Sequence, residues 1–121
     1  MTGSKMAGKE TIGCDEEVTD SGKTKSREIF APSEVNASDT AREKAEDKAK
    51  AAMAKAIETI KKNYVCDDDD CTQMVISRHL DTKIVCHEAS QKDKDTKITE
   101  NGYLCRATCT WTVTIECEEA S

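Results

Sequence analysis

An apolar stripe with helical spacing is the first pattern along the chain, and it begins near residue 41. Its members recur at steps of three and four residues, the period of an α-helix with one buried face. They are Ala41, Ala45, Ala49, Ala52, Met53, Ala56, Ile57, Ile60 and Tyr64. Ser38 or Asp39 can cap the first turn. We predict a helix over about residues 39–63, and because its stripe is mostly alanine, it should lie close against its partner.

A second pattern, alternation with a period of two, covers residues 103–117. The odd positions are apolar, from Tyr103 to Cys117, whereas the even positions are mostly polar and include four threonines. Such alternation predicts a strand with one buried face and one face open to solvent or to a partner. Asn101 and Gly102 precede this strand and form a dipeptide typical of a two-residue hairpin turn.

The stretch between the helix and the last strand is rich in β-favouring residues but less regular. Met74, Ile76, Ile84 and Cys86 all occupy even positions. We interpret the stretch as two strands, about 72–79 and 82–89, with one long strand as the alternative. Residues 91–100 are polar and are expected to form a hairpin tip.

Together these patterns predict an α+β fold in which one amphipathic helix packs on a small antiparallel sheet of about three strands. Residues 1–36 are polar and mixed in charge, so we expect a flexible, disordered N-terminal tail. Within it, only residues 29–31 are apolar enough to dock as a short edge strand. Residues 37–121 are then the single folded domain.

The cysteine content changes the picture of the core. The chain is 3% aromatic and 35% charged, yet it has seven cysteines, a composition typical of small domains held by disulfides. Cys105, Cys109 and Cys117 lie on one face of one strand and are ~13 Å or more apart at ~3.3 Å per residue. Since a disulfide needs Cα atoms within about 7 Å, these three cannot pair with one another, and if all six are oxidised, each pairs with Cys66, Cys71 or Cys86.

The turn at residues 101–102 would place Cys86 opposite Cys117, so we predict that disulfide. Cys66 and Cys71 would then pair with Cys105 and Cys109 in one of two ways. Cys14 in the polar tail is left as a free thiol. If the protein is cytosolic, the thiols would instead be reduced and could act as redox sensors, with Cys14 as the exposed reactive group.

A metal site is the rival interpretation of the same residues. Four carboxylates, Asp67, Asp68, Asp69 and Asp70, follow the helix, where their charge opposes the helix dipole, and a divalent cation would relieve this. The run nevertheless lacks the alternation of a calcium loop, and the cysteine spacings lack the paired CxxC of a zinc ribbon. A solvated acidic loop is the simpler interpretation.

Charge and motifs narrow the remaining classes of function. The formal net charge is −6 and the basic residues form no stripe, which disfavours nucleic-acid binding, and no segment is apolar enough for a membrane span. His79 and His87 are the two acid–base candidates, but no nucleophile elbow, phosphate loop, HExxH or CxxC motif accompanies them. The first 13 residues contain no apolar signal-peptide region, so the chain is either intracellular or a form without its leader.

These observations lead to three hypotheses. The first is a non-catalytic binding or interaction module without a cofactor, stabilised by disulfides, secreted or periplasmic, whose partner is another protein. The threonine face of the last strand would be its docking surface if no other layer covers it. The second is a metal-handling protein that uses residues 67–70, the cysteines, or both. The third is a cytosolic domain with free thiols.

Overall fold

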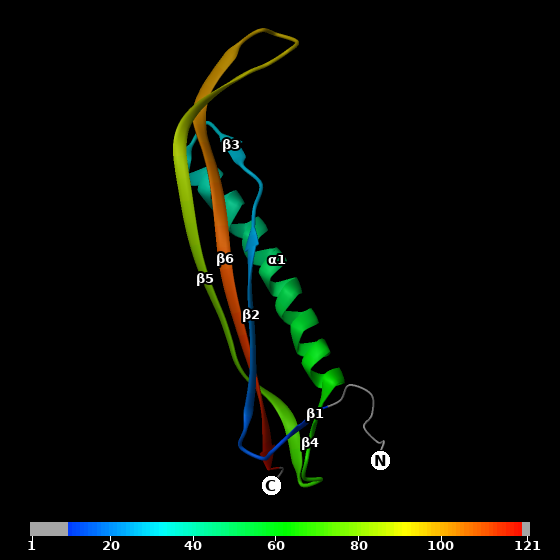
Figure 1. Cartoon of the computed structure of the whole chain (residues 1–121). Helices are drawn as coiled ribbons and strands as arrows, with labels where there is room; N and C mark the ends of the chain where they lie inside the picture. Colours follow the sequence, from blue (N-terminus) through cyan, green and yellow to red (C-terminus); the bar gives the residue numbers. More distant parts are fainter. Residues whose placement is uncertain (1–9, 120–121) are drawn as a thin grey trace. The chain divides into compact units, whose positions relative to one another are not determined.

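The computed structural model describes residues 10–119, which form an α+β fold with one long helix packed against a mainly antiparallel sheet. This confirms the predicted fold class. In chain order the elements are β1 (Glu10–Ile12), β2 (Glu17–Lys25), β3 (Ile29–Ala31), α1 (Glu34–Asn63), β4 (Tyr64–Cys66), β5 (Cys71–Lys92) and β6 (Thr99–Glu119) (Figure 1).

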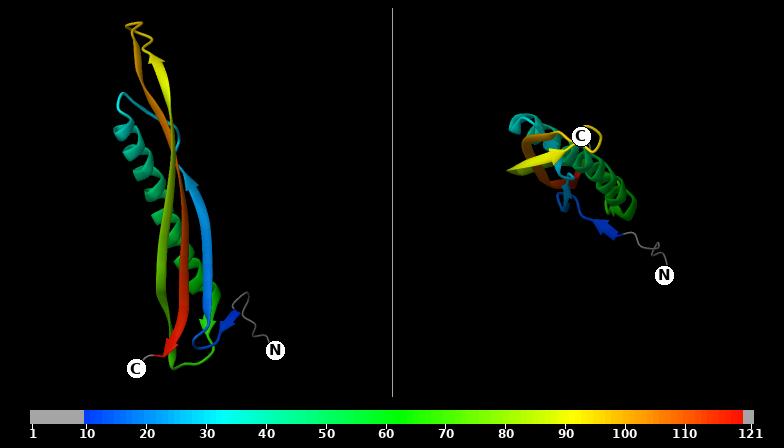
Figure 2. Two further views of the ribbon diagram at one scale, coloured as in Figure 1. Left: turned by 90° about the vertical axis from the view of Figure 1, so that its left-hand side faces the viewer. Right: turned by 90° about the horizontal axis from the view of Figure 1, so that it is seen from above.

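The predicted last strand is the centre of the main sheet. β6 pairs with β2, β3 and β5 in a four-stranded sheet (Figure 2). β3 pairs with it antiparallel, with Ile29 opposite Cys105 and Ala31 opposite Tyr103. A second sheet, which the sequence patterns did not predict, has two parallel strands, β1 and β4, with Ile12 opposite Cys66.

Contacts divide the chain into two compact units, which we describe separately. The terminal unit comprises residues 10–22, 51–79 and 111–119 of the described chain, and the central unit comprises residues 23–50 and 80–110. α1, β2, β5 and β6 each contribute residues to both units.

The core of the terminal unit consists mostly of large side chains. Met53, Ala56 and Ile60 are buried on α1. On β6, Trp111, Val113 and Ile115 are buried at alternate positions. Gly22 on β2 lies against Trp111, and a Cβ added to Gly22 would come within 2.7 Å of the indole ring. This glycine therefore makes room for the largest side chain of the core.

The core of the central unit consists of small side chains. Ala37, Ala41, Ala45 and Ala49 of α1 are fully buried, as are Cys105, Ala107 and Cys109 of β6. The Thr24 hydroxyl of β2 donates to the Ala45 carbonyl of α1 at 2.7 Å, so strand and helix approach closely. This confirms that an alanine stripe brings the helix close to its partner.

α1 starts earlier than predicted, at Glu34 rather than residue 39. The Ser33 hydroxyl accepts a hydrogen bond from the Asn36 N–H at 3.3 Å, so Ser33 caps the helix instead of Ser38 or Asp39. The extra turn adds Ala37 to the buried stripe.

The boundary of the predicted tail, residue 36, lies too far along the chain. Residues 1–9 lie outside the described residues, but β1, β2 and β3 all form within residues 10–31. The polar strand β2 is ordered because it pairs with β6 and because alternate residues, Val18, Gly22 and Thr24, are half-buried. Hydrogen bonding to a remote apolar strand thus replaces the local apolar pattern that β2 lacks.

The hairpin turn also differs from the prediction. β5 is one strand, which was the alternative interpretation, and the turn lies at residues 93–98, where the Asp93 N–H donates to the Ile98 carbonyl at 2.9 Å. Gly102 instead lies within β6, where a Cβ would collide with the Ala31 carbonyl oxygen of β3. The glycine indicates a close approach of two strands, not a turn.

β5 changes which of its positions are shielded. At the start of β5 the more buried residues stand at odd positions, namely Cys71, Gln73 and Val75. From Leu80 to Cys86 the more buried residues stand at even positions. The half-buried positions of β5 thus change from odd to even between Val75 and Leu80. Met74 and Ile76, which the even-position pattern placed with Ile84 and Cys86, are consequently 48% and 42% exposed.

Candidate functional site

Three disulfides join segments that are distant in the sequence. In the terminal unit, Cys14 bonds to Cys71 and Cys66 bonds to Cys117, with Cα separations of 6.1 and 5.8 Å. In the central unit, Cys86 bonds to Cys105, with a Cα separation of 4.1 Å. The small domain is therefore held by three disulfides.

The predicted connectivity was wrong. Cys86 does not pair with Cys117, Cys66 and Cys71 do not pair with Cys105 and Cys109, and Cys14 is not free. The free cysteine is Cys109, which is fully buried.

Two errors of interpretation explain the wrong pairs. The turn at residues 93–98 places Cys105, not Cys117, beside Cys86. Cys14 does not lie in a disordered tail, because Ile12 and Val18 on either side of it pack in the same core cluster as Cys71 and Cys117. The exclusion of pairs among Cys105, Cys109 and Cys117 holds.

The acidic loop at residues 67–70 is fixed at both ends. Cys66 and Cys71, which flank it, are both in disulfides. The Asp67 N–H donates to the Ile12 carbonyl at 2.9 Å, and the Asp70 N–H donates to an Asp68 carboxylate oxygen at 2.9 Å. Asp67, Asp68, Asp69 and Asp70 are all exposed. Across residues 10–119, no three His, Cys, Asp or Glu side chains gather closely enough to hold a metal ion.

Two further acidic segments, residues 15–17 and 116–119, meet in the same unit. The Asp15 N–H donates to the Cys117 carbonyl at 2.7 Å, and the Cys117 N–H donates to the Glu16 carbonyl at 3.2 Å. A hydrogen bond with the Glu118 side chain, partial desolvation and repulsion by Glu118, Glu17 and Asp15 raise the pKa of Glu116. The raised pKa reflects the crowding of carboxylates on this unit.

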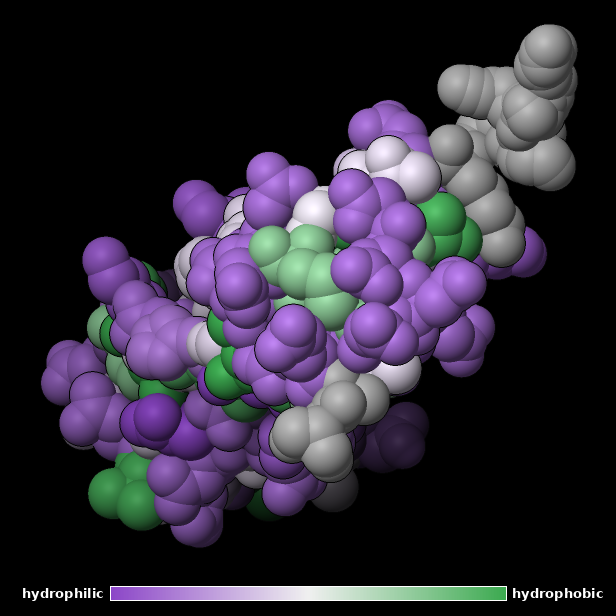
Figure 3. Space-filling model, turned by 90° about the horizontal axis from the view of Figure 1, so that it is seen from below, coloured by the Kyte–Doolittle hydropathy of each residue, from purple (hydrophilic) through white to green (hydrophobic). Residues whose placement is uncertain are grey.

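The charge is divided unequally between the units. The described terminal unit has four Lys or Arg residues against thirteen Asp or Glu, a formal charge of −9, whereas the central unit has twelve against eleven, a formal charge of +1. Figure 3 shows that hydrophilic side chains cover most of the face seen from below, with apolar side chains in small separate areas.

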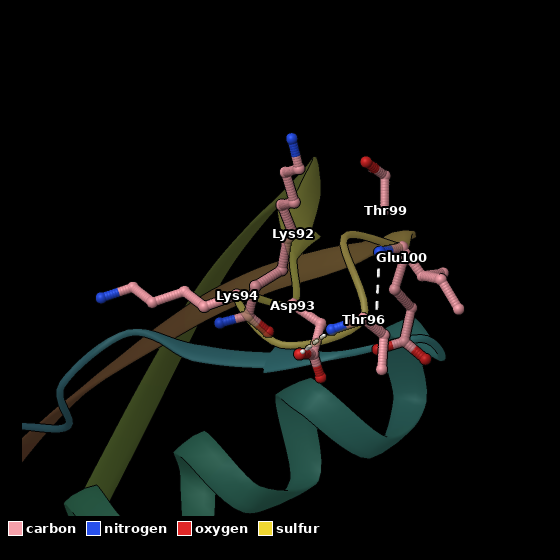
Figure 4. Close-up of a pocket in the computed structure, with 8 residues that line it drawn as sticks. Lys92, Asp93, Lys94, Thr96, Thr99 and Glu100 are labelled. Atoms are coloured by element: carbon pink, nitrogen blue, oxygen red, sulfur yellow. Dashed lines mark hydrogen bonds between the residues drawn. The ribbon is translucent and has the colours of Figure 1, made fainter.

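The hairpin tip, which we define as residues 90–101, is the second distinctive feature and belongs to the central unit. All twelve of its residues are exposed. The Asp93 carboxylate accepts hydrogen bonds from the N–H group of Asp95 at 2.7 Å and from that of Thr96 at 3.1 Å. Figure 4 shows the bond from Thr96. These bonds, from Thr96 first and then Asp95, lower the pKa of Asp93. The turn is thus ordered by its own polar groups rather than by a core.

The surface of the hairpin tip is polar and open. A shallow hollow of about 530 Å³ is lined by its residues, including Lys92, Lys94, Thr96 and Glu100 (Figure 4). The Ile98 side chain is 65% exposed although it is apolar. Neither a histidine nor a cysteine lines this hollow.

The two histidines lie on the surface. His79 is exposed. His87 Nε2 lies 3.9 Å from a Glu28 carboxylate oxygen, and Arg106 approaches the other oxygen of Glu28 at the same distance. Cys86 beside His87 is in a disulfide and therefore provides no thiol nucleophile. His87 thus takes part in a surface charge contact.

Comparison with known protein families, with curated proteins and with solved structures finds no match. The class defined by the fold and its bonds is a small, cysteine-rich α+β domain with three disulfides, which are typical of proteins that fold in an oxidising environment. Among residues 10–119, no helix has the length and apolar character needed to cross a membrane.

Proposed function

We propose that the protein is a non-catalytic interaction module of an oxidising, secreted or periplasmic compartment, and that its hairpin tip contacts a partner protein. One observation carries the proposal: twelve consecutive residues form an ordered hairpin that contributes no buried side chain to the domain. Segments kept ordered without a packing role are often positioned for recognition.

Preorganisation supports a binding role for the hairpin tip. The turn is fixed by two hydrogen bonds to Asp93, and the Ile98 N–H donates to the Thr96 hydroxyl at 3.3 Å. The Cys86–Cys105 disulfide links the two strands of the same hairpin covalently. A loop already held in one conformation loses less entropy on binding, so more of its contact energy is available for affinity.

The chemistry of the hairpin tip suits a protein surface. Ile98 offers an exposed apolar contact. The residues near it in the sequence are charged and include Lys92, Lys94 and Lys97 together with acidic residues. A hydrophobic contact with a polar rim is the usual composition of a protein–protein interface.

Site-specific photo-crosslinking tests the proposal. A photoreactive amino acid replaces Ile98 in the oxidised, full-length chain, which is incubated with extracellular or periplasmic fluid of the source. Val35, on the first turn of α1, is a matched control because it is 64% exposed against 65% for Ile98. We expect a discrete adduct from position 98 that is absent from position 35. No adduct, or the same adducts from both positions, would contradict the proposal.

A further inference from the structure

One sheet face in the terminal unit combines exposed apolar side chains with half-buried acidic ones. On β6, Thr112, Thr114, Glu116 and Glu118 alternate with Val113, Ile115 and Cys117 of the core, so the first four lie on the opposite face of the strand. Thr112, Glu116 and Glu118 are half-buried, whereas Thr114, in the middle of this face, is only 9% exposed. On β5, Met74 and Ile76 alternate with Gln73 and Val75 in the same way, and Cys71 at the start of β5 packs with Cys117. We name the six outward residues the outer face: Met74, Ile76, Thr112, Thr114, Glu116 and Glu118.

The outer face is continuous across the neighbouring strands. β6 pairs with β5 on one side and with β2 on another, and the Thr114 hydroxyl lies 3.1 Å from the Thr19 hydroxyl of β2. The described residues contain one helix, and its buried side chains pack on the opposite side with Val113 and Ile115. Two large apolar side chains of the outer face, Met74 and Ile76, are therefore left exposed.

The charge of the terminal unit indicates which kind of partner would bind the outer face. Three of the four basic residues of the terminal unit, Lys55, Lys61 and Lys62, lie on α1, which leaves Arg78 as the one on the sheet. Against them stand thirteen carboxylates, including the acidic segments at residues 15–17, 67–70 and 116–119. An anionic partner, and equally a second copy of this acidic unit, would be repelled.

We propose that the outer face binds a basic segment of another protein that also carries apolar side chains. Its apolar side chains would cover Met74 and Ile76, and its Lys or Arg side chains would pair with Glu116, Glu118 and the adjacent acidic segments. This surface is separate from the hairpin tip, so each proposal can fail without the other.

Titration with synthetic peptides tests this assignment on the oxidised, full-length chain. The probe is a labelled peptide of sequence KLKVKLK, compared with KSKSKSK and ELEVELE. We expect KLKVKLK to bind with a Kd of about 10–100 µM at low salt and to weaken about tenfold between 20 and 200 mM salt, because exposed charges are screened over about 10 Å. The other two peptides should bind at least about tenfold more weakly.

Matched variants separate the two contributions. Glu116→Gln with Glu118→Gln should weaken binding of KLKVKLK about fivefold to tenfold, and Met74→Ser with Ile76→Thr should do the same at high and low salt alike. The control for charge is Glu58→Gln on α1, and the control for apolar exposure is Val85→Thr in the central unit, where Val85 is 70% exposed. Both controls should bind as the unchanged protein does.

Three outcomes would overturn the assignment. The first is binding of KSKSKSK as tight as that of KLKVKLK, because equal affinities would show charge attraction without a docking face. The second is binding of KLKVKLK by the outer-face variants as tight as its binding by the control variants. The third is a dimer, detected by sedimentation, that Ile76→Thr abolishes, because a second copy of the chain would then occupy the outer face. NMR amide shifts that cluster at residues 74, 76 and 116 would support the proposal.

Discussion

The two units differ in the side chains that fill their cores, in their disulfides and in their charge. The terminal unit fills its interior with large side chains such as Trp111 and Ile115, has two of the three disulfides, and has a formal charge of −9. The central unit packs alanines against Cys105, Ala107 and Cys109, has one disulfide, and is close to neutral.

This difference shows that one helix and one strand can support two kinds of packing along their lengths. Large side chains stabilise the terminal unit through the apolar area that they bury. Small side chains stabilise the central unit by letting the backbones approach, as the hydrogen bond from Thr24 to the Ala45 carbonyl shows. The terminal unit should therefore be sensitive to loss of volume, and the central unit to gain of volume.

The largest expected effect is the loss of a terminal-unit disulfide. Cys66→Ala with Cys117→Ala opens a link with a sequence separation of 51 residues. The chain-entropy relation predicts a loss of about 4 kcal/mol in the free energy of unfolding. Opening Cys86–Cys105, with a separation of 19, should cost about 3 kcal/mol. Denaturant unfolding of the two double variants measures the order.

Thiol titration is the control for the pairing itself. The denatured but unreduced protein should show one reactive thiol, Cys109, and the native protein should show none because Cys109 is buried. A count of seven after denaturation would show that the disulfides do not form, and the predicted order of stabilities would then have no basis.

Truncation of a terminal-unit side chain should have the next largest effect. Ile115 is fully buried, so Ile115→Ala removes apolar contacts and leaves a cavity, which should lower the free energy of unfolding by about 3–4 kcal/mol. Ile98→Ala is the matched control, because Ile98 is 65% exposed and should lose less than about 0.5 kcal/mol. Equal losses in urea unfolding would show that the terminal core is not packed as described.

Enlargement of a central-unit side chain should destabilise by about 2 kcal/mol. Ala45→Leu adds a branched side chain where α1 faces the sheet at close range, and overpacking of this kind typically costs about 1–3 kcal/mol. Ala51→Leu on the same helix is the control, because Ala51 is exposed and leucine is a good helix former. If Ala45→Leu leaves the melting temperature unchanged, the small side chains do not set the distance between helix and strand.

The elements that sequence patterns predicted well are those whose periodicity is long and one-sided. α1 and β6 each show a complete stripe, so their type and buried faces are evident without a structure. β2 has no such stripe because it is ordered by pairing with β6, and that partner is not visible from local sequence.

The candidate site was less predictable for related reasons. Gly102 is compatible with a turn and with a close strand crossing, and only the position of β3 decides between them. That choice set the register of the hairpin and hence the partner of Cys86. Met74 and Ile76 follow the same even spacing as Ile84, but the half-buried positions of β5 are odd up to Val75, so both side chains are exposed. The outer face was therefore predicted from its threonines alone.

The smallest expected effect is the pH dependence of stability, which should have opposite directions for Glu116 in the terminal unit and Asp93 in the central unit. The pKa of Glu116 is raised in the folded terminal unit, so its charged form is disfavoured there and its contribution to stability is present at low pH and lost as the pH rises through the folded pKa. Glu116→Gln should therefore raise the melting temperature at pH 7, with the gain disappearing as the pH falls below the ordinary value of 4.5.

Asp93 in the central unit should behave in the opposite way. Its pKa is lowered by the backbone N–H groups of Thr96 and Asp95, so its contribution is present above the ordinary value of 3.8 and is lost as the pH falls through the folded pKa. Asp93→Asn should lower protection of the Thr96 amide from hydrogen exchange at pH 7, and the difference should narrow as the pH falls through the lowered pKa of Asp93. Equal pH trends for Glu116→Gln and Asp93→Asn would show that the crowded carboxylates of one unit and the hydrogen-bonded turn of the other are not electrostatically distinct.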